Sequence, residues 1–175
     1  MSSQTQSPKE MFSNLVQIGI VVRDLDRTTK TLSEVFGLGP FRTIAIPPDD
    51  GMQRSYTYRR QTGHFTYRLA LATVGEIELE IIQPLEGDSI YSDFLREHGE
   101  GIHHIRFNVA DVHPVIEYLA RHGIENIQSG SGLRAGTTWV NFGTDAQCGF
   151  IIEIMNALPG TDGHAPQIVD GKIQL

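Results

Sequence analysis

An internal repeat is the feature that most constrains how this chain can fold. The segment QIGIVVRDL, which begins at Gln17, aligns with HIRFNVADV, which begins at His104. Near the end of each half, an apolar tetrad carries one acidic residue, Glu80 in LEII and Glu153 in IEIM. A repeat of this kind favours two copies of one supersecondary unit that share a core.

Both copies show the same order of elements, which is one strand, one helix and three further strands. Apolar runs predict the strands, and an apolar face at helical spacing predicts the helix after the first strand of each copy. The fold class is therefore α+β. The expected segments are a disordered polar lead (1–12), a first βαβββ module (13–86) with an inserted loop (47–64), a linker helix (87–100), a second βαβββ module (101–156) and a C-terminal extension (157–175).

Composition and charge narrow the possible partners. The formal net charge of −7 disfavours nucleic acid, and no apolar run approaches the roughly 20 residues of a membrane helix. The beginning MSSQTQSPKE lacks the pattern of a secretory signal. Cys148 is the only cysteine, which is typical of a reducing compartment. We therefore expect a cytoplasmic protein that binds a small molecule, with neither nucleic acid nor a membrane as a partner.

The two acidic tetrads indicate a metal site. Side chains at alternate positions of a strand share a face, so Glu153 points where its apolar neighbours point. An unpaired buried carboxylate would cost several kcal/mol, which favours a bound cation. The repeat can bring Gln17, Glu80, His104 and Glu153 to one cavity around a divalent ion such as Zn, Co, Ni or Mn. The same alternation predicts that His103 faces outward and binds nothing.

Two further charged residues share faces with the predicted ligands. Glu78 lies two residues before Glu80, and Arg106 lies two residues after His104. Arg106 could hold a substrate carboxylate or enolate oxygen by a charge-assisted contact, and Glu78 could transfer a proton. The alternative is that Glu78 and Arg106 pair with each other at the strand ends.

The segment IQPLEGDSIYSDFLREHGEGIHHIRFNVADV resembles the vicinal oxygen chelate superfamily, which includes glyoxalases, bleomycin resistance proteins, epimerases and dioxygenases. It is most similar to the methylmalonyl-CoA epimerase and glyoxalase I members, which have a proline-leucine turn, a linker helix and a Gly-x-His-His-Ile strand. The resemblance implies two paired βαβββ modules that form a curved mixed sheet around a central metal-binding cavity. It also implies that the metal ligands are Gln17, Glu80, His104 and Glu153.

The activity that the resemblance implies is that of a divalent-metal-dependent epimerase, isomerase or lyase. Such an enzyme abstracts a proton next to a carbonyl through a metal-stabilised enolate, here with Glu153, Glu80 or Glu78 as the base. The strand HFTYRLAL has no acid where the epimerases carry an additional glutamate, which argues against methylmalonyl-CoA itself. A homodimer and a small carbonyl substrate are expected. An acyl-CoA is one candidate, because a short basic segment contains Arg42, Arg54, Arg59, Arg60 and Arg68.

Two other classes of protein are compatible with the same fold. An extradiol-type dioxygenase needs two histidines and one carboxylate, and Gln17 at the first position argues against it. A metal-free binding or resistance protein would have apolar groups in place of the ligands, and the two cavity glutamates argue against that. Oxygen consumption would identify the first class, and ligand binding that is insensitive to a chelator would identify the second.

Overall fold

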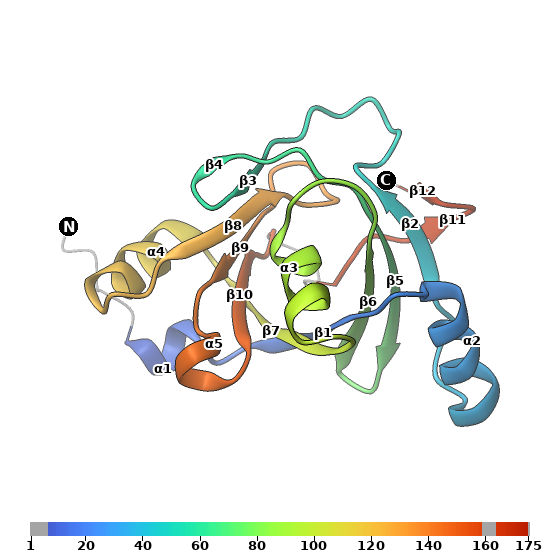
Figure 1. Ribbon diagram of the computed structural model, residues 1–175. Coiled ribbons are helices and arrows are strands. Elements are labelled where there is room, and N and C mark those ends of the chain that lie inside the picture. Colours follow the sequence, from blue (N-terminus) through green and yellow to red (C-terminus); the bar gives the residue numbers. More distant parts are fainter. Residues whose placement is uncertain (1–6, 159–163, 175) are drawn as a thin grey trace.

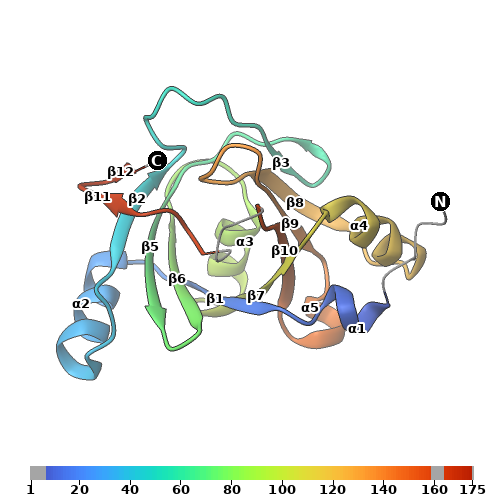
Figure 2. The ribbon, with the colours of Figure 1, turned by 180° about the vertical axis from the view of Figure 1, so that it is seen from behind.

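The computed structural model describes residues 7–158 and 164–174, and it has the expected α+β fold. Over these residues one mixed sheet of ten strands curls into a half-barrel (Figures 1 and 2). The strand order is β2-β5-β6-β1-β7-β10-β9-β8-β3-β4. The predicted fold class is thereby confirmed.

Each half of the sheet contains one copy of the repeat. The first copy consists of β1 (Leu15–Val21), α2 (Leu25–Phe36), β2 (Arg42–Ile46), β5 (Tyr67–Val74) and β6 (Ile77–Pro84). The second consists of β7 (Gly101–Val109), α4 (Val112–Arg121), β8 (Asn126–Ser131), β9 (Thr138–Phe142) and β10 (Ile151–Asn156). Strands β1 and β7 pair in antiparallel orientation and join the halves at the centre of the sheet.

The strand register reproduces the alignment of the two copies. Gln17 on β1 pairs with Glu78 on the parallel strand β6, two residues before Glu80. His104 on β7 pairs with Ile151 on the parallel strand β10, two residues before Glu153. The aligned positions of the sequence are thus equivalent positions of the sheet.

The helices of the two copies begin in the same way and cover the convex face of the sheet. Asp24 and Asp111 are their N-caps, and each side chain accepts a hydrogen bond from a backbone N–H in the first turn. Helix α2 buries Leu25 against apolar residues of the first copy, and α4 buries Val115 and Leu119 against the second. Because the helices occupy the convex face, the concave face is left for the site.

Helix α3 (Ile90–Glu97) links the two copies and lies in the hollow of the curled sheet (Figure 1). Its buried residues Ile90 and Tyr91 belong to the same core cluster as inward-facing residues of β2, β5 and β9. No helix in the described part of the chain has the length and hydropathy needed to cross a membrane.

Three segments differ from the sequence-based expectations. Within the lead, Ser7 caps the short helix α1 (Pro8–Met11) and Met11 is buried, whereas residues 1–6 lie outside the described part. The inserted loop contains the hairpin of β3 (Tyr56–Tyr58) and β4 (Gln61–Thr62), which extends the second half by pairing with β8. A short helix, α5 (Asp145–Cys148), precedes β10.

The C-terminal extension folds back onto the first half of the same chain. Its described part, residues 164–174, forms β11 (Ile168–Val169) and β12 (Lys172–Ile173). Ile168 is buried in the core on the concave side, and Arg42 Nη1 on β2 donates a hydrogen bond to the Pro166 carbonyl oxygen at 3.2 Å. Figure 2 shows this segment crossing the hollow on the side opposite α3.

Candidate active site

A cavity of about 650 Å³, including the space at its open mouth, lies on the concave face of the sheet. One part of its lining is polar and comes from the central strands β1, β6, β7 and β10. The remaining walls are largely aromatic and aliphatic. The polar lining includes Gln17, Glu80, Arg106 and Glu153, and the apolar lining includes Ile46, Tyr56, Tyr67, Leu69, Leu71, Tyr91, Leu133, Trp139 and Met155.

The histidine and both glutamates singled out by the repeat converge beside this cavity. His104 Nε2 lies 3.3 Å from Glu80 Oε2 and 3.9 Å from Glu153 Oε2. The His104 side chain is fully buried, whereas the side chains of Glu80 and Glu153 are 13% and 5% exposed. Asn141 on β9 donates a hydrogen bond from Nδ2 to Glu153 Oε2 at 2.9 Å, so Glu153 is the more tightly held of the two carboxylates.

A β-bulge and a glycine decide where the two adjacent histidines lie. Gly19 pairs with His104 but Ile20 pairs with Ile102, so His103 is an extra residue in the ladder. A Cβ atom on Gly19 would lie 2.0 Å from His104 Cε1, which shows that the imidazole rests directly on the glycine backbone. The sequence carries no local signal for the bulge.

His103 does not face outward, and that prediction is wrong. The side chain is buried and contacts the rings of Tyr91 and Phe94 on α3. Its Nδ1 lies 3.0 Å from His104 Nδ1, so one of the two rings donates to the other. The prediction assumed strict alternation along β7, and the bulge at this point places both rings on the same side of the strand.

The electrostatics of this group favour positive charge at His104. Burial alone would lower the pKa of His104, but the carboxylates of Glu153 and Glu80 outweigh it and raise the pKa. Burial together with the charge on His104 lowers the pKa of His103 well below its ordinary value, so His103 is neutral. Burial raises the pKa of Glu153, and Glu80 adds to this effect while His104 opposes it.

The donor atoms present suit a divalent metal ion. Gln17 Oε1 is buried and has no hydrogen-bond partner in the described part of the chain, and the buried His104 Nε2 faces the carboxylates of Glu80 and Glu153. One imidazole nitrogen, one amide oxygen and two carboxylates are ligand types that Zn, Co, Ni and Mn accept. No three His, Cys, Asp or Glu side chains among the described residues are already arranged as a metal cage.

Glu78 and Arg106 form a buried charge cluster next to the cavity. Glu78 is fully buried and does not line the cavity. Its Oε1 accepts a hydrogen bond from Gln17 Nε2 at 2.9 Å and lies 3.7 Å from Arg106 Nη2, and its Oε2 accepts from Arg42 Nη2 at 3.0 Å. With both oxygens engaged, Glu78 is placed to orient Gln17 and Arg106. The structure thus contains the Glu78–Arg106 ion pair that the sequence analysis gave as the alternative to roles in proton transfer and substrate binding.

Sequence reasoning missed the aromatic walls of the cavity. Tyr67, Tyr91 and Trp139 are at most 8% exposed, and all three line the cavity. Burial raises the pKa of Tyr67 and of Tyr91 well above the ordinary tyrosine value, so both hydroxyls stay protonated. Tyr67 and Trp139 occur at inward positions of predicted strands, which was a usable signal. Tyr91 comes from the linker helix, whose place in the hollow was not foreseen.

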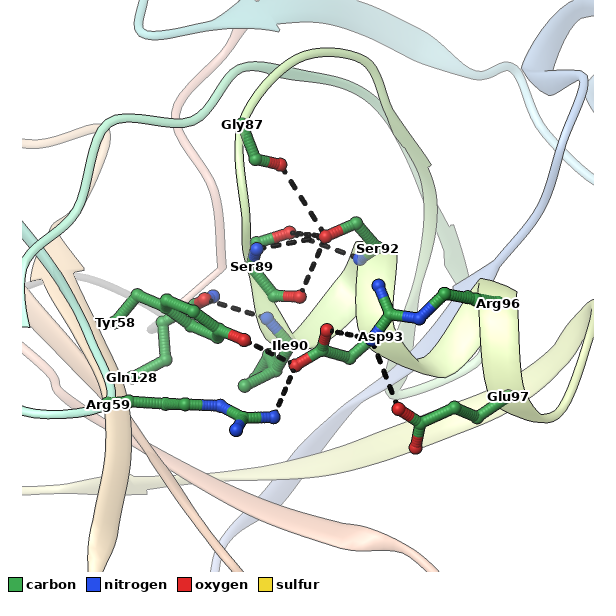
Figure 3. Close-up of polar contacts among 10 residues, drawn as sticks. All are labelled: Tyr58, Arg59, Gly87, Ser89, Ile90, Ser92, Asp93, Arg96, Glu97 and Gln128. Atoms are coloured by element: carbon green, nitrogen blue, oxygen red, sulfur yellow. Dashed lines mark hydrogen bonds and ion pairs between the residues drawn. The ribbon is translucent and has the colours of Figure 1, made fainter.

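Helix α3 is fastened to the second half of the molecule and to the inserted hairpin (Figure 3). Gln128 Oε1 on β8 accepts a hydrogen bond from the Ile90 backbone N–H at 3.0 Å. The carboxylate of Asp93 accepts hydrogen bonds from the Tyr58 hydroxyl and from Arg59 Nη2, both on the hairpin side. These contacts hold the helix that brings an aromatic ring to the cavity.

The arginines of the basic segment proposed as an anion site are paired with carboxylates, most of which lie outside that segment. Each of its five arginines lies within ion-pair distance of a carboxylate. The pairs are Arg42 with Glu78, Arg54 with Asp50, Arg59 with Asp93, Arg60 with Glu125 and Arg68 with Asp26. A guanidinium that already has a carboxylate partner is a weaker receptor for a second anion, so this segment gives little support to an acyl-CoA site.

Comparison with known families identifies the architecture. The family model of the glyoxalase, bleomycin resistance protein and dioxygenase superfamily matches residues 16–142. The chain belongs to this superfamily. Its two copies and its concave cavity are therefore a superfamily framework, and the resemblance inferred from the sequence is confirmed. A search of curated protein sequences finds no significant match.

Several solved structures share the superfamily fold with this chain. A hypothetical protein from Bacillus halodurans C-125 is 21% identical, with a TM-score of 0.64 over 85% of this chain and 96% of that one. A methylmalonyl-CoA epimerase in complex with methylmalonyl-CoA and NH4+ is 22% identical, with a TM-score of 0.63 and the same coverage. The methylmalonyl-CoA epimerase from Mycobacterium tuberculosis is 21% identical, with a TM-score of 0.62 over 91% and 94% of the two chains. At these identities the likeness shows the fold alone.

Proposed function

We propose that this chain is a divalent-metal-dependent enzyme that moves a proton at a carbon next to a carbonyl group, as an epimerase or isomerase does. The observation that carries the proposal is the meeting of His104 with Glu80 and Glu153 beside the cavity. Two carboxylates that raise the pKa of a buried imidazole favour a cation at that point, and a metal ion can replace the proton. The similarity to methylmalonyl-CoA epimerase structures supports the same class of reaction.

In this proposal Gln17, Glu80, His104 and Glu153 hold the metal ion. When bound, the ion would polarise a substrate carbonyl oxygen and stabilise the negative charge that develops next to it. The Nδ1 contact with His103 orients the ring of His104 so that Nε2 faces the two carboxylates, which is the usual role of a hydrogen-bond partner behind a histidine ligand. The aromatic walls exclude water from the rest of the cavity.

Glu80 is the residue that we propose as the base. Its carboxylate lines the cavity and has more exposed surface than that of Glu153, which Asn141 holds in place. If the Glu80 carboxylate leaves its contact with His104, it is free to accept a proton from a bound substrate. General acid-base catalysis of this kind typically contributes a factor of about 10² to 10⁴ in rate. Arg106 lines the same cavity and is placed to contact a substrate oxygen.

Metal uptake is the first test of this proposal. Protein purified without chelators, or supplied with Zn²⁺, Co²⁺, Ni²⁺ or Mn²⁺, is expected to bind about one ion per chain by elemental analysis. His104→Ala is expected to abolish this uptake, whereas His122→Ala, at the exposed end of α4, is not. Absence of uptake by the unmodified protein would disprove the site.

Proton exchange is the second test and addresses the base. A panel of 2-methyl-branched acyl-CoAs, α-hydroxyketones and hemithioacetals is incubated with enzyme in D₂O, and deuterium incorporation is followed by NMR. Glu80→Gln is expected to lower the exchange by 10²-fold or more while the ion is still bound, because an amide oxygen coordinates but does not accept the proton. Glu76→Gln, at an exposed position in the turn before β6, is the matched control. Full exchange by folded, metal-loaded Glu80→Gln would assign the role to another residue.

A further inference from the structure

The chemistry of the cavity walls points to a substrate class, and this inference deepens the proposed function by concerning the same cavity. Two arginines line the cavity, and they differ in their partners. Arg106 is next to the carboxylate of Glu78. Arg134 lies in the turn between β8 and β9, and no carboxylate of residues 7–158 and 164–174 forms a salt bridge with it. Arg134 is half-buried, and its Nε is fully buried without a hydrogen-bond partner.

The turn that carries Arg134 is rigidly built. Arg54 donates from Nε to the Gly132 carbonyl oxygen and from Nη2 to the Leu133 carbonyl oxygen, each at 3.2 Å. Both oxygens of Asp50 accept hydrogen bonds from Arg54 at 2.7 Å, and these bonds lower the pKa of Asp50 to about 2. The Thr137 hydroxyl donates to the Arg134 carbonyl oxygen at 2.7 Å. A backbone fixed in this way limits the positions that the guanidinium can take, which reduces the entropy lost when it binds an anion.

The walls around this guanidinium suit a flat or branched apolar group. Tyr56 and Trp139 lie side by side with ring centroids 6.1 Å apart. They can do so because Gly130 has no side chain, since a Cβ atom there would lie 2.4 Å from each ring. Leu133 and Met155 also line the cavity. An unpaired cation in such a wall binds a carboxylate more strongly than a solvated cation does, because little water competes.

We infer that the substrate of the cavity has a carboxylate, a second carbonyl group and an aryl-sized apolar group attached to one and the same carbon atom. Arg134 binds the carboxylate and the Tyr56–Trp139 wall binds the apolar group. A one-carbon branch such as a methyl group would leave most of this wall without a partner. The apolar group, and not a nucleotide carrier, therefore contributes most of the recognition.

Binding of a matched set of probes tests this inference. The probes are benzylmalonate, methylmalonate, which has a small branch, and dimethyl benzylmalonate, which has no charge. Trp139 is the only tryptophan of the chain and lies in the wall, so its fluorescence reports on occupancy directly. Benzylmalonate is expected to bind at least tenfold more tightly than either other probe, with and without metal. The 2-benzylmalonyl and methylmalonyl CoA thioesters are compared in the same way to measure what the carrier adds.

Arg134→Gln is the decisive variant. It is expected to weaken benzylmalonate binding about 10- to 100-fold and to leave binding of the uncharged diester unchanged. Arg121→Gln, at an exposed position in the last turn of α4, is the control and should bind all probes like the unmodified protein. The inference is overturned if benzylmalonate does not bind, if methylmalonate binds equally well, or if Arg134→Gln has no effect. Any of these results with intact metal uptake and proton exchange would leave the proposed function standing.

Discussion

The two copies of the repeat share one backbone plan but divide the chemistry between them. Both copies place a glutamate, Glu80 or Glu153, at the same point of the last strand. Around these glutamates the copies differ at four equivalent positions of the sheet. The pairs are Gln17 and His104, Gly19 and Arg106, Glu78 and Ile151, and Leu71 and Asn141.

The differing residues meet across the centre of the sheet. Gly19 pairs with His104, and Gln17 pairs with Arg106, because β1 and β7 run antiparallel. The small residue of one copy makes room for the ring of the other, and Glu78 of the first copy is paired with Arg106 of the second. The positions that the two copies share thus carry the two carboxylates, Glu80 and Glu153. The positions at which the copies differ provide the imidazole of His104 and the buried ion pair of Glu78 and Arg106.

The largest expected effect comes from making the copies alike at Glu78. Glu78→Ile introduces the residue of the second copy and removes the carboxylate next to Arg106, whose side chain is 6% exposed. Removal of one partner from a buried pair costs about 3–5 kcal/mol, which urea unfolding would measure. Adding Arg106→Leu should restore part of the lost stability, because the remaining buried charge is also removed.

Exposed Glu76 is the control for this comparison. Glu76→Ile is expected to change the free energy of unfolding by no more than about 0.5 kcal/mol. If Glu78→Ile destabilises the protein as little as Glu76→Ile does, then the charge cluster is not a structural element and the Glu78 carboxylate needs another explanation.

A smaller effect is expected when a side chain is added at Gly19. The Cβ atom of Gly19→Ala would meet the ring of His104 and displace it, at a cost of about 1–3 kcal/mol in the free energy of unfolding. Metal affinity should fall at the same time, because the ring moves away from the carboxylates. Gly101→Ala on the neighbouring strand is the control, since its nearest contact would be Phe94 Cζ at 3.9 Å. Equal behaviour of both variants in unfolding and metal titration would contradict the close packing of His104.

The smallest effect concerns the inserted hairpin, which only the first copy has. Burial tends to raise the pKa of Asp93, but hydrogen bonds from Tyr58, Arg96 and Arg59 outweigh it and lower the pKa. A lowered pKa in the folded state stabilises the protein at neutral pH, and this contribution is lost as the pH falls below about 4. Asp93→Asn should cost about 1 kcal/mol at pH 7 and less at pH 3. An equal cost at both pH values in urea unfolding would show that the charge of Asp93 is not involved.

The sequence by itself determined the order of elements in the two copies and the residues expected at the centre of the site. The alternation of apolar and polar residues has a period of two in a strand, so aligning the copies was enough to identify equivalent strand positions. This is why Gln17, Glu80, His104 and Glu153 could be singled out and why the structure brings the histidine and the glutamates together. Their roles as ligands and base stay predictions until metal uptake and exchange are measured.

The tertiary structure alone decided the features that depend on contacts between distant segments. The bulge at His103, the pairing of Glu78 with Arg42 and the position of Tyr91 each involve strands or loops far apart in the chain. The same holds for Arg134, which forms no salt bridge with residues 7–158 and 164–174. The physical reason is that periodicity records which face of an element is buried. It does not record which residue of another element that face meets, where the ladder gains an extra residue, or which charge finds a partner.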